Sequence, residues 1–334
     1  MTEKLDTQTF QNQENSNWQP PQLDKKEGYF KKQGRRIKKH YRLLPFIVPA
    51  ALFSLIFSYV PMLGISFAFK DGFNLTRGDV LWNLSHYGWT IRNFLDIFYD
   101  ESFFRAVGNT FLINILKLVI CFPLSILLAL QLAELKRQGL AKAILIIVCI
   151  PNFLSWVIVI GIWQGFLHPD TGLLGKLLFP DRVVMGEDGL FKFFVVILNI
   201  WKGVGWGSII YYAAITAIDK SYYEAATIDG ANKLQKAIKL TIPAIMPTIA
   251  LMLVLQFSGM MAAGFEQIYT MMQINPELIE SQITLDTYLY EISVVNRTNI
   301  PFATALGVFN GLIALILMLV GNKITTKTLH RSLW

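Results

Sequence analysis

Long runs without charged residues are the feature that most constrains this chain. Four stretches of 25 to 27 residues contain no Asp, Glu, Lys or Arg, and two further stretches are each interrupted by one lysine, Lys117 or Lys202. About 20 mostly apolar residues are enough for a helix to cross the hydrocarbon core of a bilayer. We therefore predict an all-α polytopic membrane protein, with six transmembrane helices at about residues 43–69, 106–133, 143–167, 193–218, 243–265 and 300–322.

The loops between these runs predict the orientation. The two terminal segments and the loops 134–142 and 219–239 hold 20 Lys and Arg but only 9 Asp and Glu, whereas the three alternate loops hold 8 and 14. Lys and Arg are retained on the cytoplasmic side of membrane proteins. Both termini are thus expected in the cytoplasm, with the chain crossing the membrane six times.

Composition excludes several other classes of protein. With 53% hydrophobic and 16% charged residues, the chain is too apolar for a water-soluble domain. The net charge of +7 lies in loops and in the tail 1–40, which we expect to be flexible, basic and in contact with anionic lipid headgroups rather than with nucleic acid. Cys121 and Cys149 both fall within apolar runs, so we expect neither a disulfide framework nor a metal site, and no cofactor bound by this chain.

The cytoplasmic loop 219–243 carries the most informative pattern. Ser221 followed by Glu224 is typical of a capping box, which predicts a helix starting near Tyr222. Gly230 is suited to closing that helix, and Pro243 to stopping a second one that begins near Asn232. The loop is therefore expected to form a helix-turn-helix elbow, either docked on a partner or lying as an interfacial helix on the lipid surface.

A resemblance favours the first interpretation. Glu224, Ala225 and Ala226, followed by Asp229-Gly230 and then by Leu240-x-Ile242-Pro243, resemble the EAA loop of permease subunits in binding-protein-dependent ABC importers. Three further stretches, 58–71, 199–211 and 264–269, are similar to maltose-type sugar permeases, in the branch that serves complex oligosaccharides and polysaccharide fragments. The similarity extends over nearly all of residues 41–334, the expected permease domain.

The resemblance implies a transport subunit in a bacterial cytoplasmic membrane, not an enzyme. A second, homologous permease would pair with this chain, two ATP-binding subunits would hold ATP and Mg²⁺, and an extracellular binding protein would deliver the sugar. The elbow would be the coupling helix seated on the ATP-binding subunit, with Glu224 and Gly230 at the motif positions. Ala225, Ala226, Asp229 and Pro243 complete that predicted set.

Residues for the sugar pathway are predicted within and beside the spans. Trp201, Trp206 and Tyr211 offer aromatic faces, and the glycines between them favour either local unwinding or close helix packing. Lys202, near mid-bilayer, is a candidate for binding a polar or anionic sugar or for pairing with an acid. Lys117 and Glu266, near the outer ends of two spans, complete the predicted pathway set.

Two other classes of protein remain as alternatives. No HExxH, G-x-S-x-G or G-x-x-x-x-G-K-[ST] pattern is present, and the four histidines are scattered over both sides, which argues against an enzyme or an autonomous ATPase. An ion-gradient-driven secondary transporter or a channel fits the hydropathy. A secondary transporter would be expected to show intramembrane acids, however, and the predicted spans contain two lysines as their only charges.

Overall fold

The computed structural model describes residues 44–74, 79–275, 279–296 and 299–329, so the predicted tail 1–40 lies outside the described residues. Within these ranges the chain is helical, and the β pairing found there is an isolated bridge between Lys70 and Trp89. The all-α prediction is confirmed. The chain divides after Leu63 into two compact units, each of which is described by itself.

The described part of the first unit is one apolar helical segment. Helix α3 (Leu44–Ser54) continues into a π-helical turn (Leu55–Tyr59) and a 3-10 segment (Val60–Phe69) that runs on into the second unit. Residues Ile47–Phe69 form a continuous apolar helix of 23 residues, long enough to cross a membrane.

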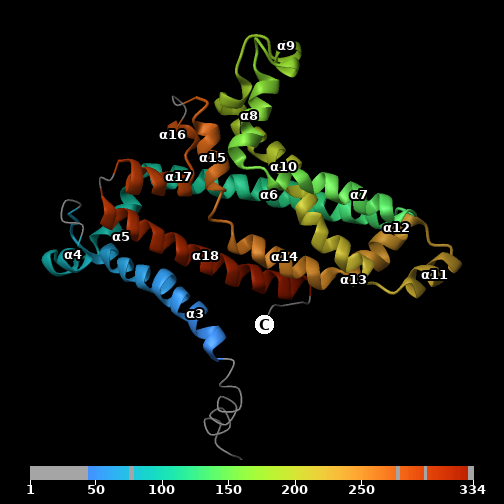
Figure 1. The fold of residues 1–334 in the computed structure, drawn as a ribbon, viewed down its shortest axis with the longest axis horizontal. Coiled ribbons are helices and arrows are strands. Elements are labelled where there is room, and N and C mark those ends of the chain that lie inside the picture. Colours follow the sequence, from blue (N-terminus) through green and yellow to red (C-terminus); the bar gives the residue numbers. More distant parts are fainter. Residues whose placement is uncertain (1–43, 75–78, 276–278, 297–298, 330–334) are drawn as a thin grey trace, which may run out of the picture. The chain divides into compact units, whose positions relative to one another are not determined.

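The second unit contains three more helices of spanning length, and Figure 1 shows them labelled. They are α6 (Glu101–Ala133), α10 (Asp188–Thr216) and α18 (Ile300–Leu329). Two further apolar segments are bent pairs of helices. Among the described residues, six spans result if each bent pair counts as one.

The first bent pair differs from the straight span predicted at 143–167. Helix α7 (Gln138–Cys149) continues as a 3-10 turn (Ile150–Phe153), and α8 (Trp156–Leu167) then leaves at 99° (Figure 1). The Oγ of Ser155 accepts a hydrogen bond from the N–H of Ile158 and caps the new helix. A charge-free run shows that a segment is apolar but not the direction in which its helix runs. The bend between α7 and α8 could therefore not be predicted from the run itself.

The second bent pair joins the cytoplasmic loop to the fifth apolar segment. Helix α12 (Lys233–Lys236), a π-helical turn (Ala237–Thr241) and α13 (Ile242–Ala244) form one arm, and α14 (Met246–Ser258) forms the other, 66° away.

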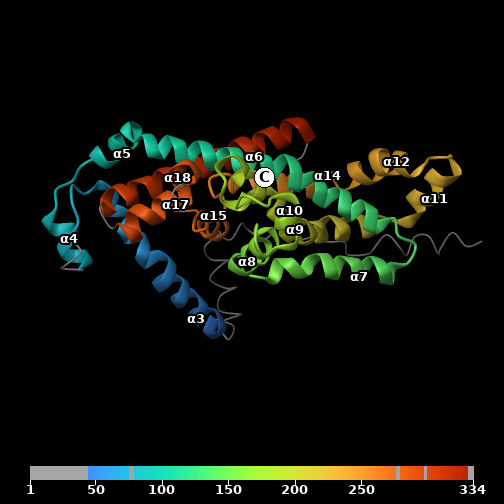
Figure 2. The same cartoon turned by 90° about the horizontal axis from the view of Figure 1, so that it is seen from above.

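Helix α10 is the centre of the second unit. It packs against α6 and α7, while α14 packs against α18, α15 (Phe265–Met272) against α8, and α17 (Leu285–Tyr290) against α6. Figures 1 and 2 agree that α11 (Lys220–Ile228) and α12 lie at one end of this unit, and α17 lies toward the other. The remaining short helices are α4 (Val80–His86), α5 (Arg92–Asp96), α9 (Leu173–Leu178) and α16 (Ile279–Gln282).

Candidate functional site

The N-cap of the elbow lies two residues earlier than the sequence predicted, at Asp219 instead of Ser221. Oδ1 of Asp219 accepts a hydrogen bond of 2.9 Å from the N–H of Ser221, so Asp219 is the N-cap and α11 starts at Lys220. This hydrogen bond holds the pKa of the Asp219 carboxyl below its usual value. The predicted Ser221–Glu224 capping box is therefore wrong, because the Ser221 amide is already bound, and the exposed Glu224 carboxylate is not needed for capping.

Gly230 closes α11 as predicted. Its φ is +75°, the left-handed conformation, and the N–H groups of Gly230 and Ala231 donate to the carbonyls of Thr227 and Ala226. This is the hydrogen-bond pattern of a Schellman turn. Asn232 then caps α12 in a reciprocal capping box with Gln235. The elbow is consequently two capped helices joined by a short, defined turn.

The second helix starts after Asn232, as predicted, and ends at Ala244, one residue beyond the predicted stop at Pro243. The arm Lys233–Ala244 passes through Pro243, and the bend comes at Ile245, before Pro247. Pro243 has no N–H to donate to the helical hydrogen-bond ladder. The turn before it, Ala237–Thr241, is a wider π-helical turn. The residue between the two helices is Ile245. Pro247 then lies in the first turn of α14, where its missing N–H donor would have no helical partner.

The elbow presents apolar side chains to its surroundings. Tyr222, Ile228 and Leu234 are exposed by 63%, 87% and 68%. Glu224, Ala225 and Asp229 are also exposed, and Ala226 is half-buried. Large apolar side chains exposed together on a polar loop are typical of a protein-binding surface.

A pocket of about 720 Å³ lies behind the elbow. Its walls come from the ends of α6 and α10, from the start of α7 and from the elbow itself, and they include Glu224 and Lys236. Lys236 donates through Nζ to Oγ1 of Thr227 at 2.7 Å, and the hydroxyls of Tyr223 and Thr241 are hydrogen-bonded at 2.9 Å. These contacts join the two helical segments of the elbow, α11 and Lys233–Ala244, to each other.

Among the predicted pathway residues, Trp201, Trp206 and Tyr211 lie on one continuous helix. Helix α10 is unbroken from Asp188 to Thr216, so the local unwinding considered for its glycines does not occur. A Cβ on Gly205 would lie 2.4 Å from the backbone oxygen of Val148 on α7, which shows that this glycine permits close packing.

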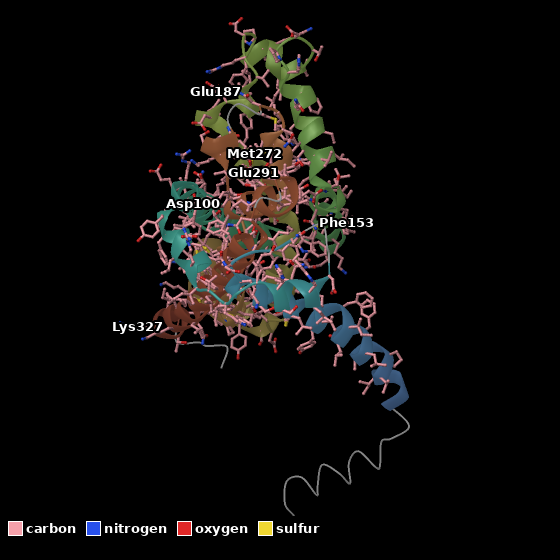
Figure 3. All side chains as sticks on the ribbon, turned by 90° about the vertical axis from the view of Figure 1, so that its left-hand side faces the viewer. Asp100, Phe153, Glu187, Met272, Glu291 and Lys327 are labelled. Atoms are coloured by element: carbon pink, nitrogen blue, oxygen red, sulfur yellow. The ribbon has the colours of Figure 1, made fainter. Side chains whose placement is uncertain are left out.

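The aromatic residues of α10 differ in exposure. Trp206 is 50% exposed and meets the ring of Phe153 edge to face, 5.8 Å between centroids. Figure 3 labels Phe153 at the outside of the second unit, in agreement with its exposure of 75%. Trp201 is 37% exposed and packs against Trp163, whereas Tyr211 is buried beside Phe122.

Lys202 hydrogen-bonds to the backbone at the break between α7 and α8. Its Nζ donates to the carbonyl oxygens of Asn152 and Leu154, at 2.8 and 2.7 Å, and lies 5.2 Å from the centroid of the Trp156 ring. These carbonyls belong to the bend, where regular helical partners are lost. Glu266 lies within electrostatic reach of Lys202, and its Oε1 accepts a hydrogen bond from the N–H of Trp156.

Lys117 likewise hydrogen-bonds to the backbone, at the end of the fifth apolar segment. Its Nζ donates to the carbonyl oxygen of Ala263 at 2.7 Å and to Oε1 of Gln267 at 3.5 Å. On the other side, the carboxylate of Asp286 lies against the backbone N–H groups of Ala263 and Gly264. Burial raises the pKa of Asp286, and these N–H groups and the Lys117 charge oppose that rise.

The structure thus brings Lys202 and Glu266 together and places Lys117 near Gln267, but it does not bring Tyr211 into that group. Gln267 and Asn199, which hydrogen-bond to each other, and Asp286 were not identified from the sequence as site residues. The one signal available for Gln267 was its place in the stretch 264–269. None of the described residues forms a cluster of three or more His, Cys, Asp or Glu side chains suited to a metal ion.

Comparisons with known proteins agree with this architecture. The family model described as binding-protein-dependent transport system inner membrane component matches residues 121–327. In Bacillus subtilis strain 168, protein LplB is 33% identical over 87% of this chain and 90% of its own length. The polygalacturonan/rhamnogalacturonan transport system permease protein YteP, from the same strain, is 34% identical over 89% and 93%.

Solved structures give the same result. A chain of a bacterial ABC transporter involved in the import of the acidic polysaccharide alginate superposes with a TM-score of 0.78 at 32% identity, covering 89% of this chain and 99% of that one. A chain of a bacterial alginate ABC transporter in complex with an alginate pentasaccharide-bound periplasmic protein matches with the same TM-score at 33% identity, covering 90% and 99%.

Proposed function

Because the chain belongs to the family of inner membrane components of binding-protein-dependent transport systems, we propose that it is the permease subunit of an ATP-driven importer for oligosaccharides or polysaccharide fragments. The substrate class rests on the relatives, whose names include polygalacturonan and rhamnogalacturonan transport and alginate import. Its partners are a second, homologous permease, two ATP-binding subunits that carry ATP and Mg²⁺, and an extracellular sugar-binding protein. Its place is a bacterial cytoplasmic membrane, with both termini in the cytoplasm.

The observation that carries the coupling role is the elbow of α11 and α12. Its turn is defined by Gly230, its two arms are tied by side-chain hydrogen bonds, and its apolar side chains Ile228 and Leu234 are exposed. A stiff lever with an apolar face is suited to sit on an ATP-binding subunit and to follow its movement. Closure of the two ATP-binding subunits would then displace the helices of each permease as rigid bodies and reverse the side from which the pathway opens.

Within this mechanism the predicted coupling residues have separate tasks. Glu224 does not cap α11, and its exposed carboxylate is available to a partner subunit. The small side chains of Ala225 and Ala226 allow that subunit to approach α11 closely. Asp229 and Gly230 form the turn. The pathway residues are Trp201, Lys202, Trp206, Tyr211, Lys117 and Glu266.

We expect Glu224→Ala and Gly230→Asp to uncouple ATP hydrolysis from sugar uptake. Asp, like Asn, can adopt the left-handed conformation at φ +75°, so the two variants differ in charge. The Asp carboxylate adds a second negative charge beside Asp229 at the C-terminal end of α11, where the helix dipole disfavours it, and this destabilises the turn. The assay is uptake and ATPase activity of the complete transporter in proteoliposomes, with insertion of each variant checked by its amount in the membrane. Asn tolerates the left-handed conformation, so Gly230→Asn is the matched control and is expected to keep most of the uptake. Wild-type uptake by both Glu224→Ala and Gly230→Asp would contradict the coupling role.

The alternative, an ion-gradient-driven transporter or channel, is separated by one purification. The tagged chain is extracted from its native membrane in mild detergent and its companions are identified by mass spectrometry. We expect an ATP-binding subunit, a second permease and a sugar-binding protein. Recovery of the chain alone, without ATPase activity above background, would favour the alternative.

A further inference from the structure

Three aromatic rings form a cluster between α15 and α17. Phe265 and Tyr269 lie one turn apart on α15 and stack with centroids 5.2 Å apart and 18° between their planes. Tyr290, from the end of α17, meets these rings at 4.9 and 5.2 Å. None of the three is buried, whereas Ile268 and Met271, on the opposite side of α15, are completely buried. We call Phe265, Tyr269 and Tyr290 the aromatic platform.

The platform stands on an unusually well-fixed base. Gly264, the residue before α15, has φ +95°, and the peptide groups around it are held from both sides by Lys117 of α6 and Asp286 of α17. Gln267 adds bonds to the carbonyl oxygen of Val195 and to Asn199 on α10. Such a base fixes the position of α15 before any ligand arrives, which lowers the entropic cost of binding.

The chemistry of the platform suits a sugar. Aromatic rings have electron-rich faces that attract the C–H groups on the flat side of a pyranose, and tyrosine hydroxyls both donate and accept hydrogen bonds. The rings of Tyr269 and Tyr290 contact each other, so the two hydroxyls are offered from two different helices. Exposed Glu266 on the same helix supplies a carboxylate oxygen as an acceptor for sugar hydroxyls.

The location agrees with an entry position. Figures 1 and 2 show α15 and α17 away from the end of the second unit that carries α11 and α12. Helices α15 and α17 pack against each other, and the three rings of the platform lie at this contact. If the elbow faces the cytoplasm, the platform faces the outer half of the pathway.

We propose that Phe265, Tyr269 and Tyr290 form a sugar-stacking subsite that receives one ring of the substrate on the outer side of the permease. This inference rests on the proposed function. It assigns binding to residues other than the tryptophans of α10, and it makes the platform a determinant of apparent affinity rather than of ATP turnover.

The test measures uptake by the complete transporter with its sugar-binding protein in proteoliposomes. The probes are radiolabelled pentasaccharides of alginate, galacturonan and arabinan, and radiolabelled maltopentaose, each supplied alone. The variants are Tyr269→Leu and Tyr290→Leu, which keep an apolar side chain but lose the ring, and Tyr269→Phe, which keeps the ring. Folding is checked by thermal unfolding of the purified complex.

For the probe that the wild type transports, we expect each Leu variant to raise KM about 3- to 10-fold with little change in kcat, as the loss of one aromatic contact predicts. Tyr269→Phe should stay near the wild type. Unchanged KM in both Leu variants, or a lower unfolding temperature with no change in KM, would overturn the subsite and leave only a packing role. Uptake by the wild type that does not require ATP would instead overturn the proposed function.

Discussion

At the scale of single residues, the two lysines within the spans donate hydrogen bonds to backbone carbonyl oxygens. Lys202 donates to two carbonyl oxygens at the bend after α7, and Lys117 donates to the carbonyl of Ala263. In a membrane, carbonyl groups without a helical partner have no water to replace it. Each lysine therefore stabilises a break in a helix, a role compatible with a remaining N–H directed at a sugar.

We expect Lys202→Met to destabilise the permease by about 1–3 kcal/mol, because it leaves two carbonyl groups at the bend unpaired. The measurement is the thermal unfolding temperature of the purified complex in detergent. Lys176→Met, at an exposed lysine on α9, is the control and should leave this temperature unchanged. An unchanged unfolding temperature in Lys202→Met would show that the bend does not depend on this side chain.

The sequence identified both lysines as unusual, but not the atoms they bind. An ionisable residue in an apolar run is visible in the sequence alone. Its partner carbonyls become available only where a helix breaks or ends. The break between α7 and α8 was not predicted, whereas the carbonyl of Ala263 lies near the predicted end of the fifth span, 243–265. For the same reason the sequence placed the cap of α11 at Ser221 instead of Asp219, since both residues are good caps and only the backbone geometry distinguishes them.

At the scale of elements, the glycines of α10 set how closely the helices approach. A Cβ on Gly205 would lie 2.4 Å from the backbone oxygen of Val148, and one on Gly207 would lie 2.9 Å from Oγ of Ser125, whereas Gly203 has open space. The sequence left unwinding and close packing open as explanations. The continuous helix favours packing, with α7 and α6 each touching α10 through a separate glycine.

Two substitutions on α10 distinguish the effect of close helix packing from the effect of helix propensity. We expect Gly205→Ala to destabilise the permease by about 1–3 kcal/mol, because α7 must move away from α10. Gly203→Ala adds the same methyl group where nothing lies within 4 Å, so it should be neutral or slightly stabilising. Thermal unfolding of the two purified variants decides, and equal unfolding temperatures would contradict the packing role of Gly205.

At the scale of the whole molecule, apolarity and charge predicted the number of apolar segments and a helical fold. They did not predict that two of the six segments are bent, by 99° and 66°. Hydrophobic runs constrain the solvent in which a helix lies, while the direction of each arm depends on tertiary contacts such as those between α15 and α8. The rigid base under α15, with members from three different helices, was likewise invisible to any local pattern.

The orientation of the whole chain can be tested with single cysteines. Leu177 on α9 is 77% exposed, and Lys136 in the loop 134–142 is also exposed. With a membrane-impermeant maleimide, we expect Leu177→Cys to react in intact spheroplasts and Lys136→Cys to react only after permeabilisation. The wild type, whose Cys149 is buried and Cys121 half-buried, is the control for background labelling. Reaction of Lys136→Cys in intact spheroplasts would reverse the proposed topology.

The exposed side chains of the elbow also bear on how the subunit is made. Until its docking partner arrives, a newly synthesised copy presents Ile228, 87% exposed, and Leu234 to water on a loop that is already folded by its own caps. Such a surface is the kind that chaperones and membrane proteases recognise. The abundance of the subunit in the cell is therefore expected to follow the supply of its partner, with unassembled copies removed by degradation.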